Sequence, residues 1–242
     1  MKTFALQQSE SPDKRWIASP LHLMLVLAAV AVLAWRGTIV SAQMRAAVDP
    51  HRVTMYERTI FFEWLAFAIV VAGVRLAGSP LSAVLGERWR SPLHVLRDIG
   101  IAMLFWAVST PALSIIAVHP HNAGPDRAVL FLMPQSSTEM LLWSALAVSA
   151  GICEETVYRG YLQRQFGALT QSASAGIVLA AIAFGAAHAY KGLWGAVRAG
   201  MLGAMLGALA QWRRSVRPGM ISHAWTDFFA GVLARALKIP VG

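Results

Sequence analysis

Seven long apolar runs, separated by short polar segments, constrain the fold of this chain more than any other feature. Six of the runs are 17–20 residues long and poor in charge, which is about the length of α-helix that crosses a ~30 Å hydrocarbon core; the run Thr138–Phe166 is longer, at 29 residues. These runs predict membrane-spanning helices. They are approximately Ser19–Trp35, Ile60–Leu76, Ile99–Val118, Thr138–Phe166, Ser172–Tyr190, Leu193–Trp212 and Met220–Leu237.

The composition of the chain agrees with this interpretation. Hydrophobic residues make up 57% of the 242 residues and charged residues only 14%, whereas soluble domains carry roughly 25% charged residues. The predicted fold class is therefore all-α: a polytopic membrane helix bundle of about seven transmembrane helices. A short apolar run at Ala128–Met133 cannot span a bilayer, and as a re-entrant segment it would raise the number to eight.

The sequence contains no linker, heptad array or fixed-period repeat, so a single membrane domain over residues 1–242 is expected. We predict that residues 1–127 form N-terminal scaffold helices. Because the unusual polar groups gather in the second half, residues 138–237 are expected to form the catalytic core. In that half, Gly203 and Gly207 lie four residues apart in one run, which predicts a close helix contact.

The net charge of +9 comes largely from basic residues in short segments between apolar runs. They lack the aromatic interleaving of single-strand binders, so no nucleic-acid partner is expected. The positive-inside rule instead predicts a cytoplasmic N-terminus, with the lipid bilayer as a partner. The compact loops indicate a bacterial plasma (inner) membrane. This orientation places inside the basic residues Lys2, Lys14, Arg15, Arg75, Arg88, Arg90, Arg97, Arg159, Arg164, Arg213, Arg214 and Arg217.

Three polar islands interrupt three different apolar runs of the second half. Ionisable residues are costly in a membrane and are functional candidates by default. Because the islands stand on separate helices, they predict one polar intramembrane cavity. Their residues are Glu154, Glu155 and Arg159 in the first, Phe184 and His188 in the second, and His223 and Asp227 in the third.

The two adjacent glutamates of the first island are expected to have different tasks. Glu155 and Arg159 are four residues apart, so they share a helix face and form an ion pair in the favourable order. Glu154 points about 100° away from that face, which leaves it free to act as a general base. In the alternative, both carboxylates only hold helices together. Glu63, in the second apolar run, is a further candidate for the cavity wall.

The two histidines suggest a hydrolytic site. Alone, His188 would more often be a hydrogen-bonded core histidine, with Phe184 shaping the wall beside it. His223 and Asp227 are four residues apart, so the carboxylate can accept from one imidazole nitrogen and leave the other directed at substrate. Together with Glu154 these groups suit peptide-bond hydrolysis: the glutamate takes a proton from water, His188 positions the water, and donors near His223 stabilise the oxyanion.

Helix arithmetic tests whether these groups can meet. At 1.5 Å per residue, Glu154 and His188 lie roughly 18 Å and 26 Å above the turn that joins their helices. His223 lies only about 5–10 Å above the next turn on that side. Straight, upright helices would keep these groups apart, so tilting or breaks at Gly185 and Gly192 are predicted, as is tolerated around a wet cavity.

The turns beside these helices carry positive charge, which the positive-inside rule assigns to the cytoplasm. The cavity is therefore expected to open toward the cytoplasm. The arginines that mark these turns are Arg164, Arg213, Arg214 and Arg217.

The ordered motifs E-E-x-x-x-R, F-x-x-x-H and H-x-x-x-(N/D), between about Trp143 and Val232, resemble the CPBP family of intramembrane proteases. That family includes CAAX prenyl endopeptidases and bacteriocin-processing or self-immunity proteins. The resemblance implies a metal-independent glutamic mechanism in which Glu154 and His188 activate water. It also implies that His223, with the polar residue four positions later, forms the oxyanion site.

The sequence departs from the family pattern at Asp227. The CAAX peptidases of the family use asparagine there, whose amide donates a hydrogen bond, whereas an ionised aspartate would repel an oxyanion. Asp227 must therefore be protonated or must orient His223, and we expect the orienting role.

The leading hypothesis is an endopeptidase that hydrolyses a membrane-associated peptide or protein substrate without a cofactor. A zinc-dependent intramembrane protease is one alternative, although the sequence has no H-E-x-x-H motif and its candidate ligands lie on three helices. A non-catalytic peptide-binding or bacteriocin immunity membrane protein, or a small transporter, is another. Nothing in the sequence indicates a groove for a prenyl group.

Overall fold

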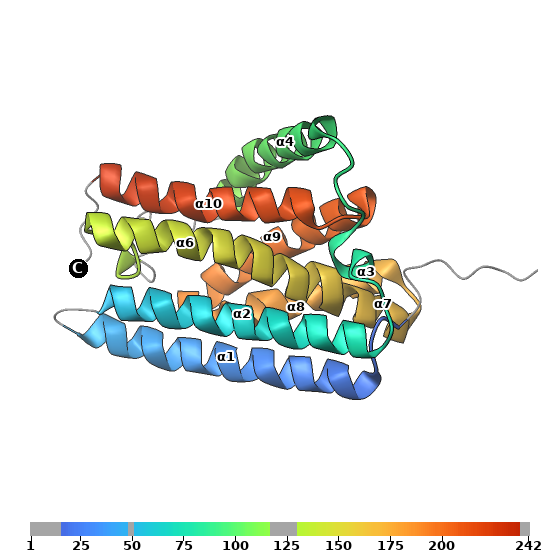
Figure 1. Cartoon of the computed structure of the whole chain (residues 1–242). Helices are drawn as coiled ribbons and strands as arrows, with labels where there is room; N and C mark the ends of the chain where they lie inside the picture. The colour runs from blue at the N-terminus through green and yellow to red at the C-terminus, as the bar shows by residue number, and fades with distance from the viewer. Residues whose placement is uncertain (1–15, 48–50, 117–129, 238–242) are drawn as a thin grey trace, which may run out of the picture.

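The computed structural model describes residues 16–47, 51–116 and 130–237, and the regular structure in these ranges is entirely helical. Figure 1 shows the helices as a bundle of roughly aligned rods. In chain order the elements are α1 (Pro20–Ala46), α2 (Arg52–Leu76), α3 (Ser82–Leu85), α4 (Pro92–Ile116), α6 (Ser137–Glu154), the π-helix η2 (Glu155–Leu162), α7 (Gln163–Thr170), α8 (Ala173–Ala187), the 3₁₀ turn η3 (Ala189–Lys191), α9 (Gly192–Arg213) and α10 (Arg217–Ala236).

The helix lengths and surfaces suit a bilayer. Five helical stretches are long and apolar enough to cross a membrane, while α8 is a shorter apolar helix of 15 residues. Large hydrophobic side chains are exposed along the bundle, as on the lipid-facing surface of a membrane protein; they include Leu21, Leu76, Leu93, Leu104 and Leu141. The predicted all-α polytopic membrane bundle is confirmed.

The predicted re-entrant run lies partly outside the described residues. Its described part, Leu130–Met133, forms a single turn closed by a hydrogen bond of 3.0 Å between the Met133 N–H and the Leu130 carbonyl. That turn is anchored to α2, because the Phe131 carbonyl accepts from Arg52 and the Leu132 carbonyl accepts from the Tyr56 hydroxyl.

Helix α6 occupies the middle of the bundle, between α2 and α10 (Figure 1). Helix α1 packs on α2 and α8, and α8 packs on α9 and α7. Helix α4 contacts α10 and α9 and stands at the far side of the bundle from α1. The three islands lie on α6 and η2, on α8, and on α10. Helix α10 packs on α6 and helix α8 packs on η2, so the islands stand on neighbouring elements.

Serine caps fix where two of these helices begin. Ser136 accepts a hydrogen bond from the Glu139 N–H, and the Glu139 carboxylate bonds back to the Ser136 N–H, so α6 opens with a complete capping box. Ser172 caps α8 in a similar way by accepting from the Ala175 N–H. These caps satisfy backbone donors that would be costly to leave unpaired in a membrane.

Glycines allow the site-bearing helices to approach closely. A Cβ atom on Gly151 would lie 2.6 Å from the Met220 carbonyl oxygen, so α6 and α10 touch through their backbones. The close contact predicted for Gly203 and Gly207 is also present: added Cβ atoms would lie 3.2 Å from Phe184 and 2.7 Å from Gln163, respectively. Larger residues at these positions would push apart the helices that bring the islands together.

Candidate active site

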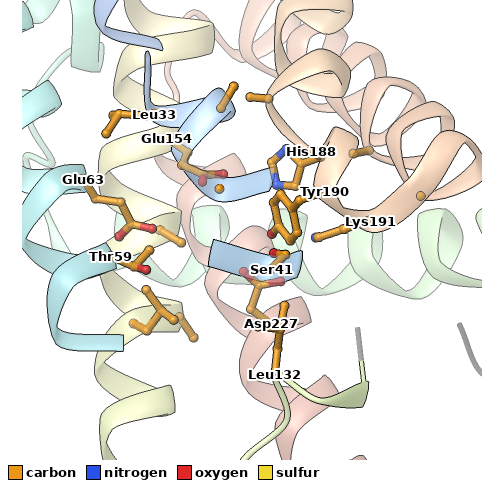
Figure 2. A pocket seen from close by; sticks show the side chains of 18 of the residues that line it. Leu33, Ser41, Thr59, Glu63, Leu132, Glu154, His188, Tyr190, Lys191 and Asp227 are labelled. Carbon is orange, nitrogen blue, oxygen red and sulfur yellow. The ribbon is translucent and has the colours of Figure 1, made fainter. Parts of the chain in front are cut away.

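A cavity of about 870 Å³ lies within the bundle, and residues from each of the three islands line it. Figure 2 shows Glu154 and His188 on opposite walls, with their polar ends directed toward each other. His223 and Asp227 from α10 line the same cavity, and Phe184 forms part of its wall. Helices α1, α2 and α4 also contribute lining residues, so the first half of the chain helps to enclose the site.

The cavity lies toward the end of the bundle where α1 ends and α2 begins. Its lining residues do not include the arginines of the basic turns, which are Arg164, Arg213, Arg214 and Arg217. The prediction that it opens on the side of the arginine-bearing turns is therefore wrong. The prediction relied on the positive charge of these turns, whereas His188 follows the last residue of the 15-residue helix α8 and lies a full helix length from the turn that precedes α8.

The local structure around the glutamates departs from a regular helix. Helix α6 ends at Glu154, and the chain continues as a π-helix from Glu155 to Leu162. The single run Thr138–Phe166 predicted one continuous helix here. Single π turns are rare and occur often at functional sites. The change in helical winding falls directly between the two glutamates.

Both glutamates reach the same imidazole. The Glu155 Oε1 atom lies 2.9 Å from Nδ1 of His223, and the Glu154 Oε2 atom lies 3.7 Å from Nε2 of the same ring. The first distance is a hydrogen bond, whereas the second is a longer electrostatic contact. The histidine therefore stands between two carboxylates that are adjacent in the sequence.

Glu155 belongs to a network sealed from solvent. Its side chain is fully buried, and its Oε1 atom also accepts a 2.8 Å hydrogen bond from Arg159. The predicted Glu155–Arg159 ion pair is thus present. The guanidinium of Arg159 stacks 4.1 Å from the centre of the Phe184 ring. One carboxylate oxygen therefore connects η2 to His223 on α10, while Arg159 connects η2 to Phe184 on α8.

The predicted contact between Asp227 and His223 is present, and it falls on the cavity side of the ring. The Asp227 Oδ2 atom lies 3.5 Å from Nε2 of His223, the nitrogen that Glu154 also faces. Glu155 takes the orienting position on Nδ1. The sequence did not indicate Glu155 as a partner, because i, i+4 spacing identifies partners within one helix only, whereas Glu155 comes from η2. The backbone of Asp227 is held by Trp143, whose Nε1 donates to its carbonyl at 2.8 Å.

His188 is fixed by its own helix. Its Nδ1 atom lies 2.8 Å from the Phe184 carbonyl, which can only accept, so Nδ1 donates. In the neutral ring, Nε2 is then left as an acceptor, and Figure 2 shows the ring directed into the cavity. The Phe184 ring centre lies 4.4 Å from the His188 ring centre and 6.0 Å from that of His223, in agreement with its predicted place in the wall.

The helices reach this arrangement by one of the two predicted breaks and by tilting. Helix α8 ends at Ala187, and after the turn η3 the chain enters α9 at Gly192, which has φ 81°. The predicted break at Gly185 is wrong, since this residue lies inside α8, where a Cβ would sit 2.8 Å from the Ala196 carbonyl oxygen. Helix α9 runs obliquely behind α10 in Figure 1, which shifts α10 relative to α8.

Three further polar residues face the cavity. Glu63, a secondary candidate in the sequence, accepts a 2.6 Å hydrogen bond from Ser149 and lies on the α2 wall. Tyr190 and Lys191 were missed, although they follow His188 directly. Tyr190 is the last residue of the predicted run Ser172–Tyr190, and Lys191 follows it. Among the described residues, no group of three or more His, Cys, Asp or Glu side chains has the arrangement of a metal site.

The fold and the site together define a class: a polytopic membrane bundle that holds carboxylates and histidines around an internal cavity. A comparison with protein families agrees with this class. Residues 136–229 match the family model described as type II CAAX prenyl endopeptidase Rce1-like. This segment begins at the cap of α6, extends into α10, and contains all three polar islands. The resemblance to the CPBP and CAAX proteases is confirmed for this segment. Searches of curated proteins and of solved structures found no match.

Proposed function

We propose that this chain is an intramembrane endopeptidase that hydrolyses a peptide bond of a membrane-associated peptide or protein. The single observation that carries the proposal is the opposition of Glu154 and His188 across a cavity inside the bundle. The match of residues 136–229 to CAAX-type endopeptidases supports the same reaction class. The side chain of Glu154 is 23% exposed, so water in the cavity can reach it.

In the proposed mechanism Glu154 acts first as a general base. A water molecule between Glu154 and His188 donates one hydrogen bond to the carboxylate and one to the free Nε2 of His188. As the water oxygen bonds to the carbonyl carbon, its proton moves to Glu154. The same carboxylic acid then protonates the nitrogen of the leaving amine, which restores the carboxylate.

His223 is the proposed donor to the oxyanion. Its Nδ1 atom donates to Glu155, which fixes the ring and leaves Nε2 on the cavity side. Both nitrogens donate only when the ring is an imidazolium, so the proposal takes His223 as the cation, balanced by the carboxylates of Glu154, Glu155 and Asp227 around it. Removing one oxyanion donor from an enzyme typically costs about 10²–10³ in kcat. Glu155, Arg159 and Phe184 act as supporting residues in this proposal, since they hold His223 and His188 in position and Glu155 and Arg159 do not line the cavity.

The proposal is tested by peptide cleavage in detergent. Wild type is compared with Glu154→Ala and His188→Ala, first on a prenylated CAAX-type peptide and then on membrane peptides that co-purify with Glu154→Gln. Cleavage by wild type and its loss in both variants is the expected result. Unchanged cleavage in either variant would overturn the assignment.

Two additional measurements separate the alternatives. Loss of activity after chelation, with recovery when stoichiometric zinc is added, would indicate a zinc-dependent protease in place of the mechanism in which Glu154 activates water. Peptides that bind equally to wild type and Glu154→Gln, with no cleavage by either, would instead indicate a binding or immunity protein.

A further inference from the structure

Lys191 brings an ammonium group to the wall of the cavity beside the candidate catalytic residues. It lines the cavity together with Glu154, His188 and Asp227. In Figure 2 its side chain extends toward the space that Tyr190 and Asp227 also face. The Nζ atom lies 5.6 Å from the centre of the Tyr190 ring. A cation at membrane depth is costly unless it is paired or used, so its place here needs a reason.

The backbone holds Lys191 in a fixed relation to His188. The Lys191 N–H donates to the His188 carbonyl at 2.9 Å, which is the i to i+3 bond of a 3₁₀ turn. Side chains three residues apart in such a turn lie above one another, so both project to the same side. Gly192 follows with φ 81°, a conformation that favours glycine, and turns the chain away into α9.

Two carboxylates that line the cavity with Lys191 suggest a role for its ammonium group. Glu154 and Asp227 place two carboxylates within 3.7 Å and 3.5 Å of Nε2 of His223. An oxyanion that forms beside this nitrogen would be repelled by the Asp227 carboxylate. Lys191 lines the same cavity as both carboxylates, and Figure 2 shows its side chain directed to the part of the cavity where Asp227 lies. It is therefore placed to offset the charge that the aspartate adds to the site.

We propose that Lys191 is a catalytic residue whose ammonium group compensates Asp227 and stabilises the oxyanion; this inference rests on the proposed endopeptidase function. When Glu154 removes a proton from water, the new C–O bond forms and the carbonyl π electrons move onto oxygen. Lys191 donates a hydrogen bond to that oxyanion beside His223. When the C–N bond breaks, the electron pair leaves with the amine, which takes the proton back from Glu154. Lys191 keeps its own proton throughout.

A double-mutant cycle between Lys191 and Asp227 tests the pairing without needing a substrate. In detergent, Lys191→Met alone should lower the midpoint of thermal unfolding by at least about 3 °C, because it removes a basic side chain that, like His223, shares the cavity with Asp227. Adding Asp227→Asn should recover most of this loss. Additive effects of the two changes would overturn the pairing, and they would do so even if wild type cleaved no peptide.

Kinetics test the oxyanion role. On a cleaved prenylated CAAX-type peptide, Lys191→Met should lower kcat by roughly 10²-fold with little change in KM, as expected for a lost oxyanion donor. Lys191→Arg, which keeps the charge, should recover part of kcat. The double variant Lys191→Met, Asp227→Asn should be at least about tenfold faster than Lys191→Met, because the asparagine amide can donate. Arg75→Met, in the exposed last turn of α2, is the control and should match wild type.

A peptide with an amidated C-terminus separates this role from simple substrate capture. If Lys191 bound the terminal carboxylate of the substrate, Lys191→Met would raise KM for the free-acid peptide alone, which would overturn the proposal. An equal loss of kcat on the free-acid and amidated peptides supports it. If wild type cleaves neither peptide, the proposed function fails for this substrate class, while the unfolding cycle still decides whether Lys191 compensates Asp227.

Discussion

The two sides of His223 differ sharply although adjacent glutamates contact them. On the sealed side, formed by Glu155 and Arg159, both side chains are at most 1% exposed and joined by hydrogen bonds. On the cavity side, Glu154 is 23% and Asp227 37% exposed, and both face Nε2 at longer distances. Two residues adjacent in the sequence thus have different surroundings: Glu155 is buried and hydrogen-bonded, whereas Glu154 faces the cavity.

This contrast teaches how a membrane helix can carry charge for two purposes. The sealed side keeps His223 in position, because a buried, hydrogen-bonded ion pair resists rearrangement. The cavity side carries the proposed general base, which must exchange protons with water. The helical winding changes from α to π between the two glutamates, whose carboxylates face opposite nitrogens of one ring.

The largest expected effect on stability comes from breaking the sealed side. Glu155→Gln removes the charge that pairs with buried Arg159 and accepts from His223, so the free energy of unfolding should fall by about 3–5 kcal/mol. Reversible unfolding in mixed micelles measures this change. Glu154→Gln is the matched control on the cavity side and should alter the free energy of unfolding by less than about 1 kcal/mol. Equal losses in both variants would contradict the division of tasks.

A smaller loss of stability should follow from a substitution that forces α6 and α10 apart. Gly151→Ala places a methyl group 2.6 Å from the Met220 carbonyl oxygen, between α6 and α10. Overpacking of this kind costs roughly 1–3 kcal/mol in free energy of unfolding. Gly100→Ala on the exposed face of α4 has no neighbour within 4 Å and serves as control. It should be neutral or slightly stabilising, since alanine favours helix; equal destabilisation by both would refute close packing as the cause.

The smallest effect is expected at Asp227, on the cavity side. Asp227→Asn removes a charge but keeps the shape and a polar group near His223, so kcat/KM should stay within about fivefold of wild type, roughly 1 kcal/mol in the barrier. Steady-state cleavage measures it, with Asp227→Ala as the comparison that also removes hydrogen bonding. A complete loss of cleavage in Asp227→Asn would mean that the carboxylate itself takes part in the reaction.

Much of the fold could be predicted from apolar run length alone, because membrane-spanning segments must satisfy their backbone internally. The Glu155–Arg159 pair could also be predicted, since both partners lie on one helix face at fixed spacing. The same reasoning correctly singled out Gly203 and Gly207 as close-contact positions. These successes all depend on local periodicity, which a single sequence contains.

The failures concern relations between helices. Spacing rules correctly brought Asp227 to His223, but they did not reveal the partner on Nδ1, which is Glu155 from another element. The side on which the cavity lies was also wrong, because it depends on where α8 ends and on the tilt of α9. Lys191 was overlooked because a cation near a helix end usually extends to the membrane surface. Its relation to the cavity depends on the 3₁₀ turn after His188.

The most direct test of the central claim is the single-turnover cleavage rate of Glu154→Gln, measured beside its unfolding midpoint on the same prenylated CAAX-type or co-purified membrane peptide that wild type cleaves. If Glu154 is the base in the cavity and Glu155 the support behind it, the rate should fall at least about 10³-fold while the unfolding midpoint stays near that of wild type. A rate within about tenfold of wild type in the folded variant would contradict the account.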